Sequence, residues 1–160
     1  MNTIQKLWKK EQIPIKDGIY FNSGKAFELY FTSYPNPILK VKEPFDLEEF
    51  LEKNQEELSC VDITCKLKLP NNHTLVSGEG SYGSEGFIGY LDKNKEPIWL
   101  IYSESFNPII SLKKLDSKIK ADSSLLGISF ILDIDNPLDI KIFEPEKLNK
   151  KKTIINYLDK

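Results

Sequence analysis

The glycine-rich stretch GEGSYGSEGFIGY, from Gly78 to Tyr90, has the residue spacing that comes nearest to a chemical motif in this chain. It opens with a G-x-G-x-x-G, the spacing with which dinucleotide-binding proteins and protein kinases bring backbone close to phosphate groups. In the dinucleotide fold the third glycine opens a helix, whereas Gly83 leads into SEGFIGYL, which has the pattern of a strand. The chain contains no V-A-I-K, H-R-D or D-F-G sequence either. The motif alone therefore does not indicate a nucleotide site.

The charges in this stretch also argue against phosphate. Glu79 and Glu85 would repel a triphosphate, and no Walker-type lysine compensates for them. Tyr82 stands between these two acids, either packed inward or exposed as a contact for a protein partner. A small-ligand-binding protein or an enzyme with a site near the glycine-rich loop remains the alternative.

We expect the glycines to shape the backbone. Gly78, Gly80 and Gly83 would permit positive φ in an irregular connection between strands. Gly86 and Gly89, inside or beside the next strand, indicate a bulge or a close approach by another backbone. The stretch is then a corner between two strands.

Other catalytic constellations are sparse. The single histidine, His73, lies in a predicted turn, PNNHT, with no carboxylate or thiol partner nearby in the sequence. LDIDNPLD gathers Asp133, Asp135 and Asp139 near one turn, but Pro137 stands where a calcium loop needs a ligand. We therefore expect a solvated turn there, and no catalytic residue, metal site or cofactor in the protein.

The segment FDLEEFLEKNQEEL predicts an amphipathic acidic helix near 46–58. Asp46 is suited to the N-cap, with a glutamate three residues on as its capping-box partner. Glu48, Glu52 and Glu56 would follow one another at i, i+4 and i+8, an arrangement in which like charges repel. This face is either ordinary solvated surface or a surface that attracts a basic protein partner.

Strands dominate the elements that must position these residues. IQKLWKKEQI has helical spacing and predicts a short N-terminal helix, and KAFELYFT alternates as a strand, with ILKV as its partner beyond the turn SYPNP. A period of two then predicts strands near 60–69, 73–77, 86–91, 97–103, 109–113, 125–134 and 139–143. IWLIY is apolar on both faces and should lie centrally. The predicted fold is α+β: a mainly antiparallel sheet of about six to eight strands, with an N-terminal helix and the acidic helix near 46–58.

The two cysteines are expected to be free thiols. In VDITCKLKL the apolar residues alternate, so Cys65 should lie on the buried face of a strand with Val61, Ile63 and Leu67. Cys60, an odd number of positions away, would point to the other face, and the two would not form a disulfide.

Length and composition limit which classes of protein this chain could belong to. The 160 residues are 40% hydrophobic and 29% charged with a net charge of -2, which is typical of one globular domain over 1–160, with a lysine-rich tail or helix from about 145. All 22 basic residues are lysines, which lack the bidentate grip of arginine, so specific nucleic-acid binding is not expected. No segment approaches the roughly 18 apolar residues of a membrane span, and no secretory signal is evident. We expect a cytoplasmic protein with no membrane partner.

The run GSYGSEGFIGYLDKNKEPIWLIYSESFNP, residues 80–108, resembles the strand–hairpin–strand core of small bacterial immunity proteins, through its glycines, the Gly86–Phe87 pair, Trp99 and Asn107–Pro108. The resemblance implies a small, non-enzymatic protein that binds and neutralises a cognate toxin domain. Residues 43–58 carry seven acids against one lysine, which would suit a basic toxin. We expect the partner to contact an acidic surface that includes Glu48, Glu49, Glu52, Glu56, Glu79, Tyr82 and Glu85.

Overall fold

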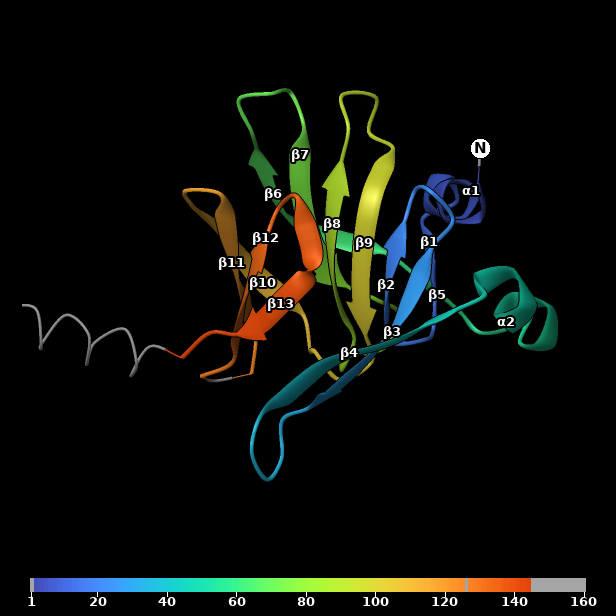
Figure 1. Cartoon of the computed structure of the whole chain (residues 1–160), viewed down its shortest axis with the longest axis horizontal. Coiled ribbons are helices and arrows are strands. Elements are labelled where there is room, and N and C mark those ends of the chain that lie inside the picture. The colour runs from blue at the N-terminus through green and yellow to red at the C-terminus, as the bar shows by residue number, and fades with distance from the viewer. Residues whose placement is uncertain (1, 126, 145–160) are drawn as a thin grey trace, which may run out of the picture.

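The computed structural model describes residues 2–125 and 127–144, which form two helices and 13 strands (Figure 1). In chain order these are α1 (Thr3–Lys9), β1 (Gln12–Pro14), β2 (Gly18–Phe21), β3 (Ala26–Thr32), β4 (Ile38–Phe45), α2 (Leu47–Lys53), β5 (Leu58–Cys60), β6 (Asp62–Lys68), β7 (Thr74–Glu79), β8 (Gly86–Leu91), β9 (Pro97–Ser103), β10 (Ile109–Leu115), β11 (Lys118–Ser123), β12 (Ser129–Asp133) and β13 (Asn136–Ile142). The predicted N-terminal helix and the predominance of strands are confirmed. The tail predicted from about 145 lies outside the described residues.

The strands form three antiparallel sheets. Seven strands pair in the order β4-β3-β2-β9-β8-β7-β6, four pair as β10-β11-β12-β13, and β1 pairs with β5. Strand β9, which contains IWLIY, lies in the middle of the large sheet between β2 and β8, as predicted. The β3–β4 hairpin extends away from the rest of the molecule (Figure 1).

Strand β9 is apolar on both sides because each face of the large sheet is covered. On one face, Trp99 and Ile101 belong to a core shared with residues of the four-stranded sheet, such as Phe130. On the other face, Leu100 and Tyr102 belong to a second core that includes side chains of α1, β1 and α2. The indole Nε1 of Trp99 also donates a hydrogen bond of 2.9 Å to the carbonyl of Ile134, which joins the two sheets. The sequence leaves a helix or a second sheet as the cover, and both are present.

Helix α2 is shorter than predicted. It begins as expected, with the Asp46 side chain accepting the backbone N–H of Glu49 at 3.1 Å. It ends at Lys53 because the Asn54 side chain donates to the carbonyl of Phe50 at 2.8 Å, which takes over a helical hydrogen-bonding position. The segment up to residue 58 then turns into β5, so the predicted i, i+4, i+8 series of glutamates is interrupted before Glu56. Neither helix in the described residues is long and apolar enough to cross a membrane.

A bulge changes the predicted burial of β6. The pairing with β7 shifts between Ile63 and Cys65, and a one-residue shift moves the following side chains to the opposite face. Val61 accordingly packs on the second core and Leu67 on the first, while Ile63 is exposed. Cys65 is half-buried rather than buried, and both cysteines are free, as predicted.

Candidate functional site

The structure divides the seven predicted contact residues between α2 and the glycine-rich loop. Three lie exposed on α2 and one lies in the connection after it: Glu48, Glu49, Glu52 and Glu56. The other three lie at the end of β7 or in the loop that follows: Glu79, Tyr82 and Glu85. Six of these side chains are at least partly exposed, and Glu85 is not.

Glu85 is an internal anchor. The sequence places it among the surface acids, whereas in the structure it is 1% exposed and both its oxygens accept hydrogen bonds from the protein. Oε2 accepts the hydroxyl of Tyr102. Oε1 accepts the hydroxyl of Ser59 at 3.2 Å and the backbone N–H of Tyr82 at 3.2 Å. A carboxylate with three donors tolerates burial that an unpaired one would not.

These hydrogen bonds attach the loop to strand β5. The Ser81 N–H donates to the Ser59 hydroxyl at 2.9 Å, and the N–H of Cys60 donates to the Ser81 hydroxyl at 2.9 Å. The loop is therefore bonded at Ser81, Tyr82 and Glu85 rather than free to move as an open connection.

Gly80 and Gly86 act by leaving space for neighbouring groups, and the positive φ predicted at Gly78, Gly80 and Gly83 is wrong. Among the described glycines only Gly24 and Gly127 have positive φ. A Cβ on Gly80 would overlap the Glu85 carboxylate, and one on Gly86 would overlap the backbone carbonyl of Asn107. The close approach of another backbone predicted at Gly86 is thus confirmed. The G-x-G-x-x-G motif makes room for a carboxylate of its own chain.

Tyr82 points outward. Its side chain is 63% exposed although its backbone N–H is held by Glu85. This decides between the two orientations that the sequence leaves open. A large aromatic side chain on a bonded loop loses little conformational freedom when it meets another protein.

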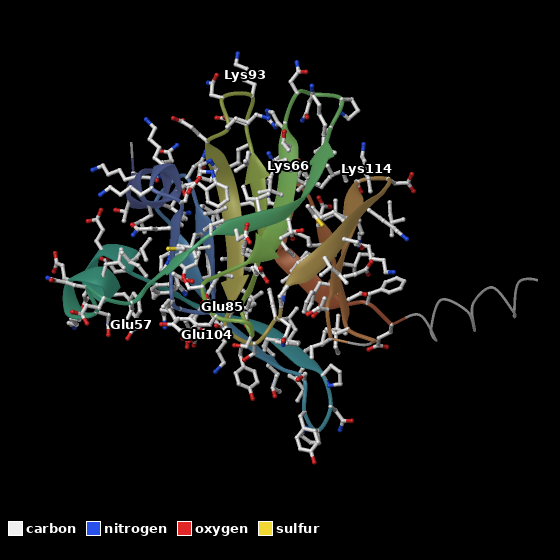
Figure 2. The ribbon with its side chains drawn as sticks, turned by 180° about the vertical axis from the view of Figure 1, so that it is seen from behind. Glu57, Lys66, Glu85, Lys93, Glu104 and Lys114 are labelled. Atoms are coloured by element: carbon white, nitrogen blue, oxygen red, sulfur yellow. The ribbon has the colours of Figure 1, made fainter. Side chains whose placement is uncertain are left out.

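Three acids that the sequence analysis did not single out lie near Glu85. Figure 2 shows Glu57, Glu85 and Glu104 at one end of the molecule, opposite Lys66, Lys93 and Lys114. Asp17 joins them, because its carboxylate accepts the backbone N–H of Glu104 at 2.8 Å and the hydroxyl of Ser103 at 2.7 Å. We call Asp17, Glu57, Glu85 and Glu104 the carboxylate cluster. Within residues 2–125 and 127–144 none of the four forms an ion pair with a lysine.

Two acids of the carboxylate cluster have raised pKa values, chiefly because they are partly buried. Burial, and after it the charges of Asp17, Glu85 and Glu57, raise the pKa of Glu104 above its ordinary value. Burial also raises the pKa of Asp17, against the opposing effect of its hydrogen bonds. For both acids the largest cause is burial, which disfavours the charged form, and the charge of Lys16 also opposes the shift at Asp17.

The remaining predicted features lie elsewhere. The turn with Asp133, Asp135 and Asp139 belongs to the β12–β13 hairpin. Asp135 lines a cleft together with Asn71, which precedes the start of β7, whereas Glu79 lies at the other end of that strand. The acids of this hairpin therefore do not extend the carboxylate cluster. The ring Nδ1 of His73 lies 2.7 Å from the hydroxyl of Tyr90 in the same region. In the described part of the chain, no group of three or more His, Cys, Asp or Glu side chains is arranged to hold a metal ion.

No protein-family model matches this chain, and no curated protein or solved structure matches it. Its function is therefore inferred from the chemistry of the site alone.

Proposed function

We propose that this protein binds a basic protein partner through Tyr82 and the exposed acids of the carboxylate cluster, Glu57 and Glu104, and that it neutralises a toxin domain in this way, as an immunity protein does. The observation that carries the proposal is the Glu85 network, which holds the loop while leaving Tyr82 63% exposed. Glu57 and Glu104 are exposed at the same end of the molecule (Figure 2). A fixed aromatic residue beside unpaired charges is the composition of a binding hot spot.

The charges of this end favour a cationic partner in two ways. In the described residues these carboxylates form no ion pairs, and their charges produce a negative potential that accelerates the approach of a basic protein. Burial and, after it, the charges of Asp17, Glu85 and Glu57 raise the pKa of Glu104, and a partner's positive charges would offset the part that comes from these neighbouring charges.

The alternative, an enzyme or small-ligand site at the glycine-rich loop, has less support. Glu85 is the carboxylate best placed in the loop for acid–base chemistry, yet its oxygens already accept three internal hydrogen bonds. The space at Gly80 is filled by this same carboxylate and not left for a ligand.

The test begins with the product of the neighbouring gene, coexpressed with this chain and assayed for copurification and for loss of toxicity. Association is then measured at several salt concentrations for Glu57→Gln/Glu104→Gln and for Tyr82→Ala. The charge variant should associate roughly tenfold more slowly at low salt and depend less on salt. Tyr82→Ala should weaken binding about 30-fold, the effect of a hot-spot residue worth about 2 kcal/mol.

The matched control is Glu96→Gln/Asp116→Asn, which removes two acids from the β8–β9 and β10–β11 turns at the lysine end of the molecule. It changes the net charge equally and should leave the association rate within about twofold. Equal slowing by both pairs would show that only net charge matters and would overturn the proposed surface.

A further inference from the structure

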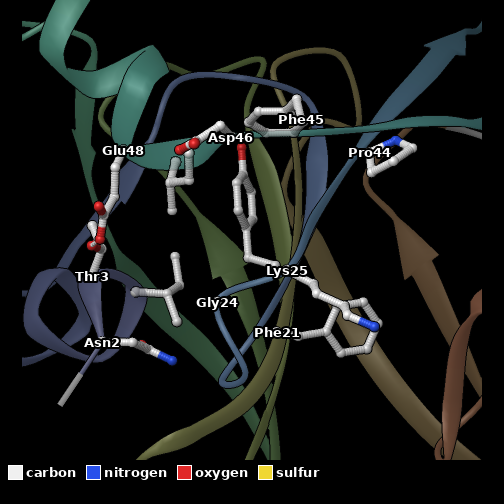
Figure 3. A pocket seen from close by; sticks show the side chains of 12 residues that line it. Asn2, Thr3, Phe21, Gly24, Lys25, Pro44, Phe45, Asp46 and Glu48 are labelled. Atoms are coloured by element: carbon white, nitrogen blue, oxygen red, sulfur yellow. Dashed lines mark hydrogen bonds between the residues drawn. The ribbon is translucent and has the colours of Figure 1, made fainter.

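A cleft of about 530 Å³ lies between α1, the β2–β3 hairpin and the start of α2 (Figure 3). Its volume is within the range of sites that enclose a small molecule or one large side chain. Glu48, a predicted contact residue, lines this cleft together with Asp46. The cleft lies at the beginning of the helix whose far end leads through Glu57 to the carboxylate cluster.

The floor of the cleft is apolar. Ile4, Tyr20 and Leu47 line it and are 2%, 0% and 7% exposed. The Tyr20 hydroxyl, the one polar atom of these three side chains, donates to the carbonyl of Lys16 and so is not available to a ligand. An aliphatic chain lying on this floor would be stabilised by its removal from water, as in any apolar site.

Two carboxylates lie on one wall. Asp46 Oδ1 accepts the N–H of Glu49 at 3.1 Å, and Glu48 Oε1 accepts the hydroxyl of Thr3 at 3.1 Å. In the described residues, the second oxygen of each has no hydrogen-bond or ion-pair partner. Two fixed carboxylates with an unused oxygen each are suited to an ammonium or guanidinium group.

Lys25 lies on the opposite wall beside Phe21 (Figure 3). It sets the polarity of the cleft, because a cation is repelled from the Lys25 side and attracted to the Asp46 and Glu48 side. The ligand that fits is therefore long, aliphatic in its middle and cationic at one end.

We propose that this cleft receives a lysine or arginine side chain of the partner protein, with its aliphatic stem on Ile4, Tyr20 and Leu47 and its charged group against Asp46 and Glu48. The inference rests on the proposed function, since it assigns a specific side chain of a basic partner to a specific site. It adds a specificity element that Tyr82 and the carboxylate cluster do not provide, because a cleft selects by length and shape as well as by charge.

The experiment uses N-acetyl-arginine amide as the probe and its uncharged isostere, N-acetyl-citrulline amide, as the ligand control. Backbone amide shifts of the ¹⁵N-labelled full chain are followed during titration to millimolar concentration. The arginine derivative should shift amides of residues 24–25 and 45–48 in a saturable way, and citrulline should bind at least about tenfold more weakly because it carries no charge.

Three variants test which charged side chains of the cleft bind the probe. Asp46→Asn/Glu48→Gln keeps a helix-capping side chain and an acceptor for Thr3 but removes both charges, and it should abolish the saturable shifts. Lys25→Gln should strengthen arginine binding by about two- to threefold, since it removes a repelling charge; an anionic ligand site would show the opposite sign. Glu96→Gln/Asp116→Asn should leave the affinity unchanged.

Equal binding of arginine and citrulline, or saturable shifts that persist in Asp46→Asn/Glu48→Gln, would overturn the inference. Its failure is distinct from failure of the proposed function. If the parent chain shows no saturable shifts with the arginine derivative, but Tyr82→Ala still weakens partner binding, only the inference about the cleft fails. Arginine binding in the cleft, with a partner that ignores Tyr82 and the carboxylate cluster, would remove only the proposed surface.

Discussion

Gly80 provides the space in which the carboxylate of Glu85 is buried, since a Cβ on Gly80 would overlap Glu85 Oε2. The two residues form one structural unit, because Glu85 in turn holds the loop through Tyr82 and Ser59.

The glycines of the loop should differ sharply in their tolerance of alanine. Gly80→Ala and Gly86→Ala should each destabilise the fold by about 1–3 kcal/mol, because the added methyl group meets Glu85 or the Asn107 backbone. Gly83→Ala, where nothing lies within 4 Å, should be neutral or slightly stabilising. Urea unfolding of the three variants measures the series. Similar losses in all three would mean that the glycines serve backbone flexibility and not space.

Removing the buried carboxylate should cost more than removing an exposed one. Glu85→Ala is expected to lower the free energy of unfolding by about 3 kcal/mol, since Tyr102 and Ser59 lose their acceptor in a buried site. In a Glu85→Ala background, Tyr102→Phe should recover part of the loss because it removes the unpaired hydroxyl. Urea unfolding of the double-mutant cycle tests this, and simple additivity of the two losses would contradict the contact.

The raised pKa of Glu104 predicts how stability depends on pH. The pKa of Glu104 in the folded protein lies above its ordinary value of 4.5, so the folded protein holds this proton more tightly than the unfolded chain. Its contribution is therefore complete below pH 4.5 and is lost as the pH rises through the folded pKa. Glu104→Gln should match the parent protein in acid and become the more stable of the two toward neutral pH, as measured by urea unfolding across this range.

Asp122 should show the opposite dependence of stability on pH in the same experiment. Hydrogen bonds from Ser111 and Ser129, with Lys120, outweigh the effect of its burial and lower its pKa below 3.8. Its stabilising effect is present above pH 3.8 and is lost as the pH falls through the folded pKa. Asp122→Asn should therefore be the less stable protein near neutral pH and approach the parent in acid. The same slope for both variants would show that global charge, not local partners, sets the response.

The hydrogen bond between Trp99 and Ile134 should contribute to the attachment of the two sheets. Trp99→Phe keeps an aromatic ring but leaves the Ile134 carbonyl without its donor, and should cost about 1–2 kcal/mol in unfolding free energy. Trp99→Ala should cost about 3–5 kcal/mol, since it also removes a buried ring. Thermal and urea unfolding measure both. No difference between the two variants would indicate that the core collapses around the smaller residue.

Local patterns predicted the long elements because burial imposes their period. The alternation of KAFELYFT and the uniformly apolar IWLIY correspond to β3 and β9, and Asp46 caps α2. Strands β1 and β5 have three residues each, too few to establish a period. The bulge between Ile63 and Cys65 reverses a face that strict alternation predicts. Strand β11 was not predicted, because it lies between the strands expected over 109–113 and 125–134, the second of which corresponds to β12.

The candidate site was less predictable than the fold, because its residues are brought together by the register in which distant strands pair. Tyr82 and the acids of α2 are visible as surface residues in the sequence, but Glu85 is not distinguishable there from an exposed glutamate. Asp17 precedes Gly18 in a turn-forming pair, which indicates the end of a strand but not its neighbour. Its proximity to Glu104 depends on the pairing of Gly18 with Tyr102 in β2 and β9. No local pattern encodes that register.

The hydrogen bond from the Glu104 N–H to Asp17 spans 87 positions of the chain. During synthesis on the ribosome, the acidic end of the molecule therefore cannot form until β9 has been synthesised and has paired with β2. A nascent chain that stops short of Glu104 lacks this surface, and so does an excised peptide covering only residues 78–90. A fragment that lacks either strand therefore lacks this acidic surface, which forms only after Glu104 has been synthesised.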